Sequence, residues 1–210
     1  MLDDVFQAGS ESIKNGQIMN KRNIVIIGIS TGGPKTLRTF FDGMPLLDGS
    51  IILVQHMIKC ANKSLCKTLN SLTEMEVRIA CHGETIKPGV VYLAPSEVHL
   101  ELVNNQKFKL VNGPKVCYVR PAVDVTMKSI KRITEDNIIG IIMTGMGKDG
   151  TDGISHIKSV GGTTFAQDEK TSVIWGMPKA AIGTGHVDYI LSTEGIRNKL
   201  ISQLGRQVFS

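Results

Sequence analysis

Residues 23–29 read N-I-V-I-I-G-I, and S-T-G-G-P follows at once at residues 30–34. The first stretch is a short, uninterrupted apolar run rich in β-branched side chains, which is typical of a strand buried on both faces. The second is a glycine-rich turn, and residues 35–42 after it have the pattern of a helix. A buried strand, a tight turn and a helix begin a βαβ unit, so this stretch predicts a parallel sheet covered by helices.

The same order of strand and helix recurs along the chain. Continuous apolar runs predict further buried strands at residues 51–55 and 138–143, and shorter strands are expected at 77–80, 90–94, 163–166 and 188–191. Helices are expected at residues 61–72, 121–133, 151–160, 177–182 and 194–204. Residues 98–103 and 108–112 predict a hairpin. The sequence therefore predicts a doubly wound α/β fold: a mostly parallel sheet with helices on both faces and an antiparallel edge hairpin.

Length and composition bound the domain organisation. The chain has 210 residues, of which 41% are hydrophobic and 20% charged, so it is long enough for one globular domain with its own core. Residues 1–20 lack a strong period, and we expect a tail or linker remnant there, with at most a weak helical turn near residues 3–7. Residues 21–210 are expected to form the domain.

Several classes of partner and location are disfavoured by composition. No stretch approaches the ~20 apolar residues of a spanning helix, so no membrane insertion is expected. The net charge is +5, but no run of Lys and Arg exceeds two residues, so no nucleic-acid partner is expected. The four cysteines, which lie at irregular intervals, predict free thiols in the cytoplasm rather than a metal site. They are Cys60, Cys66, Cys81 and Cys117.

Chemistry is expected in the loops that follow the apolar strands, because ligands of such sheets bind beyond the carboxyl ends of the strands. Residues 28–32 read G-I-S-T-G, which fits the G-x-S-x-G turn that projects a nucleophilic serine. Ser30 could instead cap the following helix. A non-enzymatic module that holds a phosphate or acidic group in the same turn is a second alternative, although Pro34 before Lys35 departs from the P-loop.

Two more strand ends carry side chains that suit nucleophilic catalysis. His56 directly follows the strand at 51–55 and is placed to act as a general base. Asp149 lies in T-G-M-G-K-D-G at residues 144–150, where it could orient a histidine or merely cap a helix. In the latter case Asp152 or Asp168 would be the next candidate for the acid. A rival order keeps Ser30 and Asp149 but takes His186 as the base.

Several motifs together resemble one known family. They are I-G-I-S-T-G-G-P, V-Q-H-M, Y-L-A-P-S-E-V-H-L, R-P-A-V-D-V-T-M, I-I-M-T-G-M-G-K-D-G and A-Q-D-E-K-T-S-V-I-W-G-M-P-K-A-A-I, in this order. In this order and spacing they resemble the catalytic domain of the chemotaxis receptor methylesterase, CheB, from about Lys21 onward. The resemblance implies hydrolysis of glutamate γ-methyl esters on chemoreceptor helices, together with deamidation of receptor glutamines. It places the catalytic triad on Ser30, His56 and Asp149.

The resemblance also implies what surrounds the triad. Backbone N–H groups of Thr31 and Met146 are expected to hold the oxyanion, and neither a metal nor an organic cofactor is expected. The partner implied is the methylated cytoplasmic helix of a chemoreceptor. Family members usually carry a receiver domain before the catalytic domain, and we expect none within these 210 residues. The sequence leaves two alternatives open: a catalytic part cut from a longer protein, with residues 1–20 as linker, or a stand-alone member. Ile58 and Trp175 depart from the family's usual residues and are expected to affect receptor preference.

Overall fold

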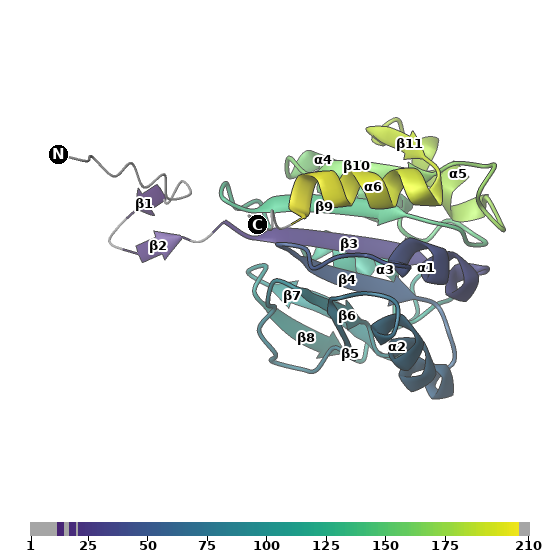
Figure 1. Cartoon of the computed structure of the whole chain (residues 1–210), viewed down its shortest axis with the longest axis horizontal. Helices are drawn as coiled ribbons and strands as arrows, with labels where there is room; N and C mark the ends of the chain where they lie inside the picture. Colours follow the sequence, from purple (N-terminus) through teal and green to yellow (C-terminus); the bar gives the residue numbers. More distant parts are fainter. Residues whose placement is uncertain (1–11, 15–16, 20, 206–210) are drawn as a thin grey trace.

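The computed structural model describes residues 12–14, 17–19 and 21–205. Its main sheet has seven strands in the order β11–β10–β9–β3–β4–β6–β5, and every pair of neighbours is parallel (Figure 1). These strands are β3 (Asn23–Ile29), β4 (Ser50–Gln55), β5 (Glu76–Ile79), β6 (Val90–Leu93), β9 (Asn137–Ile142), β10 (Thr163–Gln167) and β11 (Tyr189–Leu191). The predicted doubly wound α/β fold is confirmed.

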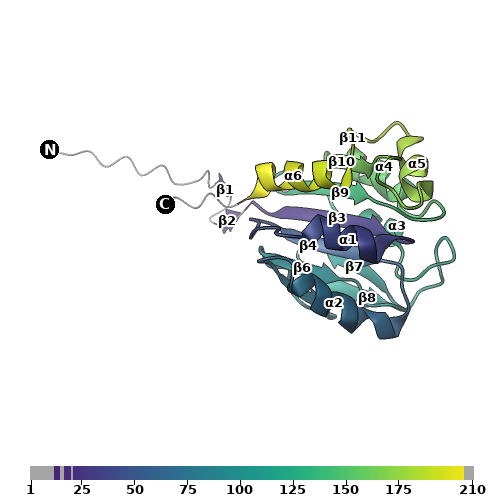
Figure 2. The ribbon, with the colours of Figure 1, turned by 45° about the vertical axis from the view of Figure 1, so that its right-hand side comes forward.

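Helices cover both faces of the sheet, as the apolar character of its strands requires. One face carries α1 (Gly33–Phe41), α2 (Asn62–Asn70) and α6 (Thr193–Leu204), and the other carries α3 (Val123–Lys128), α4 (Thr151–Ser159) and α5 (Gly176–Ile182) (Figure 2). A short 3-10 turn, η1 (Lys59–Ala61), precedes α2.

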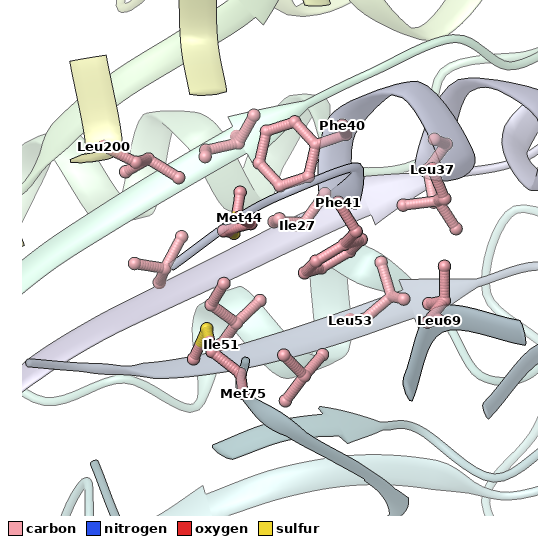
Figure 3. Close-up of a cluster of buried hydrophobic side chains, with 14 of the residues drawn as sticks. Ile27, Leu37, Phe40, Phe41, Met44, Ile51, Leu53, Leu69, Met75 and Leu200 are labelled. Atoms are coloured by element: carbon pink, nitrogen blue, oxygen red, sulfur yellow. The ribbon is translucent and has the colours of Figure 1, made fainter. Parts of the chain in front are cut away.

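Alternate side chains of the central strands point into two separate cores. Ile27 of β3 and Leu53 of β4 pack with Phe40 of α1 in the first core (Figure 3). Ile26 of β3, one residue along, packs with Met127 of α3 in the second core. This alternation is the reason that the strands have no polar face in the sequence.

The predicted hairpin forms, but it does not extend the edge of the main sheet. β7 (His99–Val103) and β8 (Lys107–Val111) pair antiparallel as a sheet of their own. Leu100, Leu102 and Phe108 are buried in the second core, and the Phe108 ring packs edge-on against Tyr92 of β6. The hairpin therefore uses its apolar side chains to cover a face of the sheet instead of its backbone to lengthen it.

Two further segments differ from the expectation. α3 is shorter than predicted, because Ser129 bonds back to the Thr126 carbonyl at 2.6 Å and accepts the Leu102 N–H at 2.8 Å just where the helix ends. An antiparallel pair, β1 (Ser12–Lys14) and β2 (Gln17–Met19), lies where only a tail was expected. The helical turn expected near residues 3–7 falls outside the described residues. None of the helices in the described part of the chain has the length and apolarity of a membrane span.

The strand order fixes where a site can form. From β3 the chain crosses to β4 on one side, and β9 joins β3 from the other side. The point at which the direction of winding reverses therefore lies beside β3, and doubly wound folds bind ligands in the crevice at that point. In Figure 1 the arrowheads of β3 and β9 mark this edge on the right-hand side.

Candidate active site

Three loops meet at the carboxyl ends of β3, β4 and β9. The Ser30 N–H after β3 donates to the Thr144 carbonyl after β9 at 2.9 Å, and the His56 N–H after β4 donates to the Ile29 carbonyl at 3.1 Å. The buried carboxamide of Gln55 donates to the carbonyls of Ser30 at 3.0 Å and His56 at 2.9 Å. Gln55 thus clamps the first two loops together, a role that the sequence analysis did not foresee.

Ser30 lies half-buried in this junction. The N-cap of α1 is Gly32, at φ 82°, and no side chain caps the helix, so the alternative in which Ser30 caps α1 is not met. Within the described part of the chain the Ser30 hydroxyl has no hydrogen-bond partner. Gly145 packs closely against it: a Cβ at position 145 would lie 2.8 Å from the Ser30 Cβ.

His56 and Asp149 are joined directly. The ring Nε2 lies 2.8 Å from Asp149 Oδ2, with 10% of the histidine side chain and 3% of the aspartate side chain exposed. An ionised carboxylate only accepts hydrogen bonds, so Nε2 is the donor in this contact, and Nδ1 is the ring nitrogen that the carboxylate leaves free. The ring makes no hydrogen bond to Ser30 among the described residues; such contacts are often loose before substrate binds.

Asp149 also holds a helix in place. Its Oδ2 accepts the Val123 N–H at 2.7 Å and its Oδ1 accepts the Asp124 N–H at 3.0 Å, so the carboxylate caps α3. The side chain of Asp124 in turn accepts the Gly153 N–H at 2.7 Å in the first turn of α4. Asp149, in the loop before α4, therefore caps α3, and Asp124 of α3 caps α4, so two buried carboxylates link these segments. The N-cap of α4 is Gly150 and not Asp149.

Two titratable groups near Asp149 have raised pKa values. Burial, and then the negative charge of Asp149, raise the pKa of the Asp124 carboxyl above its usual range. The same two causes raise the pKa of the Cys117 thiol. Ligand atoms of Cys117, Asp124 and Asp149 lie within 4.8 Å of one another. Because both carboxylates are engaged by backbone N–H groups and Asp149 also holds His56, we assign them to helix capping and histidine orientation rather than to a metal.

Two backbone N–H groups in the loops of the junction have no hydrogen-bond partner among the described residues. Thr31 and Met146 donate no backbone hydrogen bond within residues 21–205. The loop that carries Met146 is fixed on its other side, because the Gly145 carbonyl accepts the N–H groups of Gly176 at 3.1 Å and Met177 at 2.9 Å. Both positions expected to supply oxyanion donors therefore have an N–H that is not used by the fold.

The rival site residues lie elsewhere. The His186 ring bonds to Ser155 Oγ at 3.0 Å, and its carbonyl accepts from Thr164 near the start of β10, at the opposite end of the sheet from Ser30. Asp152 is exposed and pairs with Lys128 at 2.7 Å. Asp168 accepts the Thr171 N–H at 2.9 Å within its own turn. None of the three contacts His56.

Comparison with known proteins gives a consistent picture. The family model described as CheB methylesterase matches residues 25–200. A protein of Thermotoga maritima named protein-glutamate methylesterase/protein-glutamine glutaminase is 44% identical over 182 residues, which are 85% of this chain and 53% of that protein. The protein of the same name from Salmonella typhimurium is 33% identical over 94% of this chain and 57% of its own length.

A solved structure agrees with the sequence comparisons. The crystal structure of the Thermotoga maritima CheB methylesterase catalytic domain matches with a TM-score of 0.81 and 42% identity, over 87% of this chain and 99% of that chain. The chain spans about half the length of the curated relatives it matches, 53% and 52% for two of them.

Proposed function

Since the chain belongs to the CheB methylesterase family, we propose that it is a cytoplasmic serine hydrolase that removes methyl groups from glutamate γ-methyl esters on chemoreceptor helices. We also propose that it deamidates receptor glutamines. The observation that carries the proposal is the contact of 2.8 Å between His56 and the buried Asp149, at the strand ends where Ser30 lies. An oriented imidazole beside a serine on a tight turn is the arrangement that acyl transfer requires.

In the proposed reaction, Nδ1 of His56 acts as the base, because Nε2 is engaged by Asp149. In this proposal Nδ1 takes the hydroxyl proton as Ser30 Oγ attacks the ester carbonyl. The tetrahedral intermediate then collapses, the methoxy group takes that proton, and methanol leaves the acyl-enzyme. Water attacks next, with Nδ1 again as the base, which frees the glutamate and returns the proton to Ser30. Asp149 stays ionised and stabilises the imidazolium in both steps.

The oxyanion needs donors that are already in place. The free N–H groups of Thr31 and Met146 are suited to this role, because they lie on the two loops that flank Ser30 and the fold does not use them. One such donor contributes about 10²–10³ in rate. Deamidation uses the same groups, with ammonia in place of methanol as the leaving group.

The direct test is methanol release from a methylated receptor fragment. We expect Ser30→Ala and His56→Ala each to lose about 10³-fold or more in kcat, and the double variant to lose little beyond that, because a triad acts as a unit. Asp149→Asn should be clearly impaired, though far less than Ser30→Ala, because an amide holds the position but favours the wrong histidine tautomer and cannot stabilise the imidazolium. Near-full activity in His56→Ala would refute the assignment.

A phosphate-binding module without enzymatic activity is the alternative to be tested beside it. Labelling of Ser30 by a fluorophosphonate reagent, absent in Ser30→Ala, supports the hydrolase. Lack of labelling combined with thermal stabilisation by inorganic phosphate would support the module instead.

A further inference from the structure

A groove of about 720 Å³ opens directly beside His56. Its walls come from three separate segments: the loop after β4, the loop after β6, and the loop between β8 and α3. Ionic side chains line much of it, namely Lys59, Glu97, Lys115 and Arg120. Ile58, 71% exposed, and Tyr118, 94% exposed, add apolar surface. None of these residues has a part in the proposed chemistry.

The charges of the groove do not cancel. Lys59 and Glu97 form a pair at 3.4 Å, with both side chains mostly exposed. Arg120 and Lys115 have no acidic partner among residues 21–205. The groove therefore presents two uncompensated positive charges next to the proposed active site.

Arg120 differs from an ordinary solvated cation because the fold holds its guanidinium in place. Nη1 donates to Asn112 Oδ1 at 2.8 Å and to the Gly113 carbonyl at 2.6 Å, and both of these acceptors are neutral. The Nε atom is buried and has no acceptor within the described residues. A guanidinium that is fixed by neutral groups keeps its charge and its remaining donors for a ligand, and its planar fork matches a carboxylate.

We propose that Arg120, assisted by Lys115, forms a carboxylate-binding subsite that recognises an acidic side chain of the substrate close to the scissile ester. The proposal rests on the proposed function, because it takes the ester to lie at Ser30. His56 and Arg120 line the same groove, so a peptide segment bound in it lies against both the proposed general base and the guanidinium. Ile58 and Tyr118 then contact the apolar side chains of that segment.

The test compares two helical peptides, each with one glutamate γ-methyl ester. The acidic peptide has Glu three and four residues on either side of the ester, and the neutral peptide has Ala at the same positions. The measured quantity is the ratio of kcat/KM for the acidic peptide to kcat/KM for the neutral peptide. We expect a ratio of about ten in the native chain at low salt, falling as salt screens the attraction.

Substitutions test whether Arg120 and Lys115 cause the preference for the acidic peptide. Arg120→Gln should reduce it to about two, and Lys115→Gln should reduce it by a smaller factor. Arg132→Gln is the matched control, because Arg132 is an exposed arginine outside the groove and should keep the native ratio. If Arg120→Gln fails to fold, as its unfolding curve would show, Lys115→Gln and the salt dependence decide. A native ratio near one, or a native ratio retained in Arg120→Gln and Lys115→Gln, would overturn the proposal.

Failure of the proposed function can be told apart from failure of the subsite. If the native chain hydrolyses neither peptide, the esterase assignment fails. Binding of the two fluorescent peptides to the Ser30→Ala protein, measured by anisotropy, then judges the subsite alone. Preference for the acidic peptide that is lost with Arg120→Gln supports it, and equal affinity for both peptides refutes it.

Discussion

The carboxylate of Asp149 has two roles: it orients the proposed catalytic histidine, and it caps a helix. It holds His56 and accepts two backbone N–H groups of α3. Asp149→Ala leaves those buried donors without an acceptor, so we expect the free energy of unfolding to fall by about 1–3 kcal/mol. Ser30→Ala removes a hydroxyl without partners in the described structure and should change it by less than about 0.5 kcal/mol. Urea unfolding of the two variants checks this; equal stabilities would contradict it.

Asp124 predicts a dependence of stability on pH. Because burial raises its pKa in the folded state, the folded chain binds this proton more tightly than the unfolded chain. The free energy of unfolding contributed by Asp124 therefore decreases as pH rises from the ordinary aspartate value of about 3.9 through the raised value. Asp124→Asn keeps an acceptor for the Gly153 N–H and removes that loss. Relative to the native chain, it should gain stability between about pH 4 and about pH 7.

Asp152 supplies the matched control with the opposite sign. Its hydrogen bond to Lys128 lowers the pKa of this exposed carboxyl. The native chain thus gains a small stability as pH rises from the lowered value to the ordinary aspartate value of about 3.9, and Asp152→Asn should lack this gain, so it loses stability relative to the native chain between about pH 3 and about pH 5. Urea midpoints of the three proteins at about pH 3, about pH 5 and about pH 7 test the pair. A parallel response of the two variants would show that neither carboxyl behaves as described.

At the scale of elements, the loop after β9 is positioned by the start of α5. Gly176 allows the close approach: a Cβ there would lie 2.8 Å from the Gly145 carbonyl oxygen and 3.1 Å from the Gly147 nitrogen. Gly176→Ala must therefore displace the loop that carries Met146 and Asp149. We expect kcat for ester hydrolysis to fall by about tenfold or more, because a misplaced oxyanion donor alone costs that much.

Gly183, just after the same helix, is the control for this prediction. It has a right-handed helical conformation, φ −61°, and a Cβ there meets its nearest neighbours at 3.4 Å, an ordinary contact. Gly183→Ala should keep full activity. If Gly176→Ala is as active as Gly183→Ala, the start of α5 does not position the loop.

The elements also show how far the sequence predicts this structure. The central strands β3, β4 and β9 were predictable because their apolar runs are continuous and are followed by polar residues. The hairpin strands, H-L-E-L-V and K-F-K-L-V, instead alternate apolar and polar side chains, which is typical of strands with one buried face. Their place was not predictable, since only the packing of Leu100 and Phe108 against the sheet decides it. The positions of Ser30, His56 and Asp149 at strand ends were predictable from topology. The roles of Gln55 and Asp124 were not, because their partners lie on other elements of the fold.

At the scale of the whole molecule, the fold shields its cysteine thiols to different extents. Cys66 lies in the core beneath α1 and α2, and burial raises its pKa to about 11. Cys60 and Cys81 are exposed. Since the thiolate is the reactive form, we expect iodoacetamide to alkylate Cys60 and Cys81 in the native protein and Cys66 only after unfolding. Peptide mass spectrometry reads out each site, and rapid native alkylation of Cys66 would mean that this core opens readily.

The capping of α3 by Asp149 has a consequence for descendants of this chain that lose catalysis. In such a pseudoenzyme no selection would act to keep Ser30, whose hydroxyl has no partner in the described fold. Substitutions of His56 would then also accumulate. Asp149 could not be lost as freely, because α3 begins on its carboxylate, and Asp124 of that helix in turn caps α4. Asp149 would then be the one residue of the former triad to be retained, and it would be retained because it stabilises the fold.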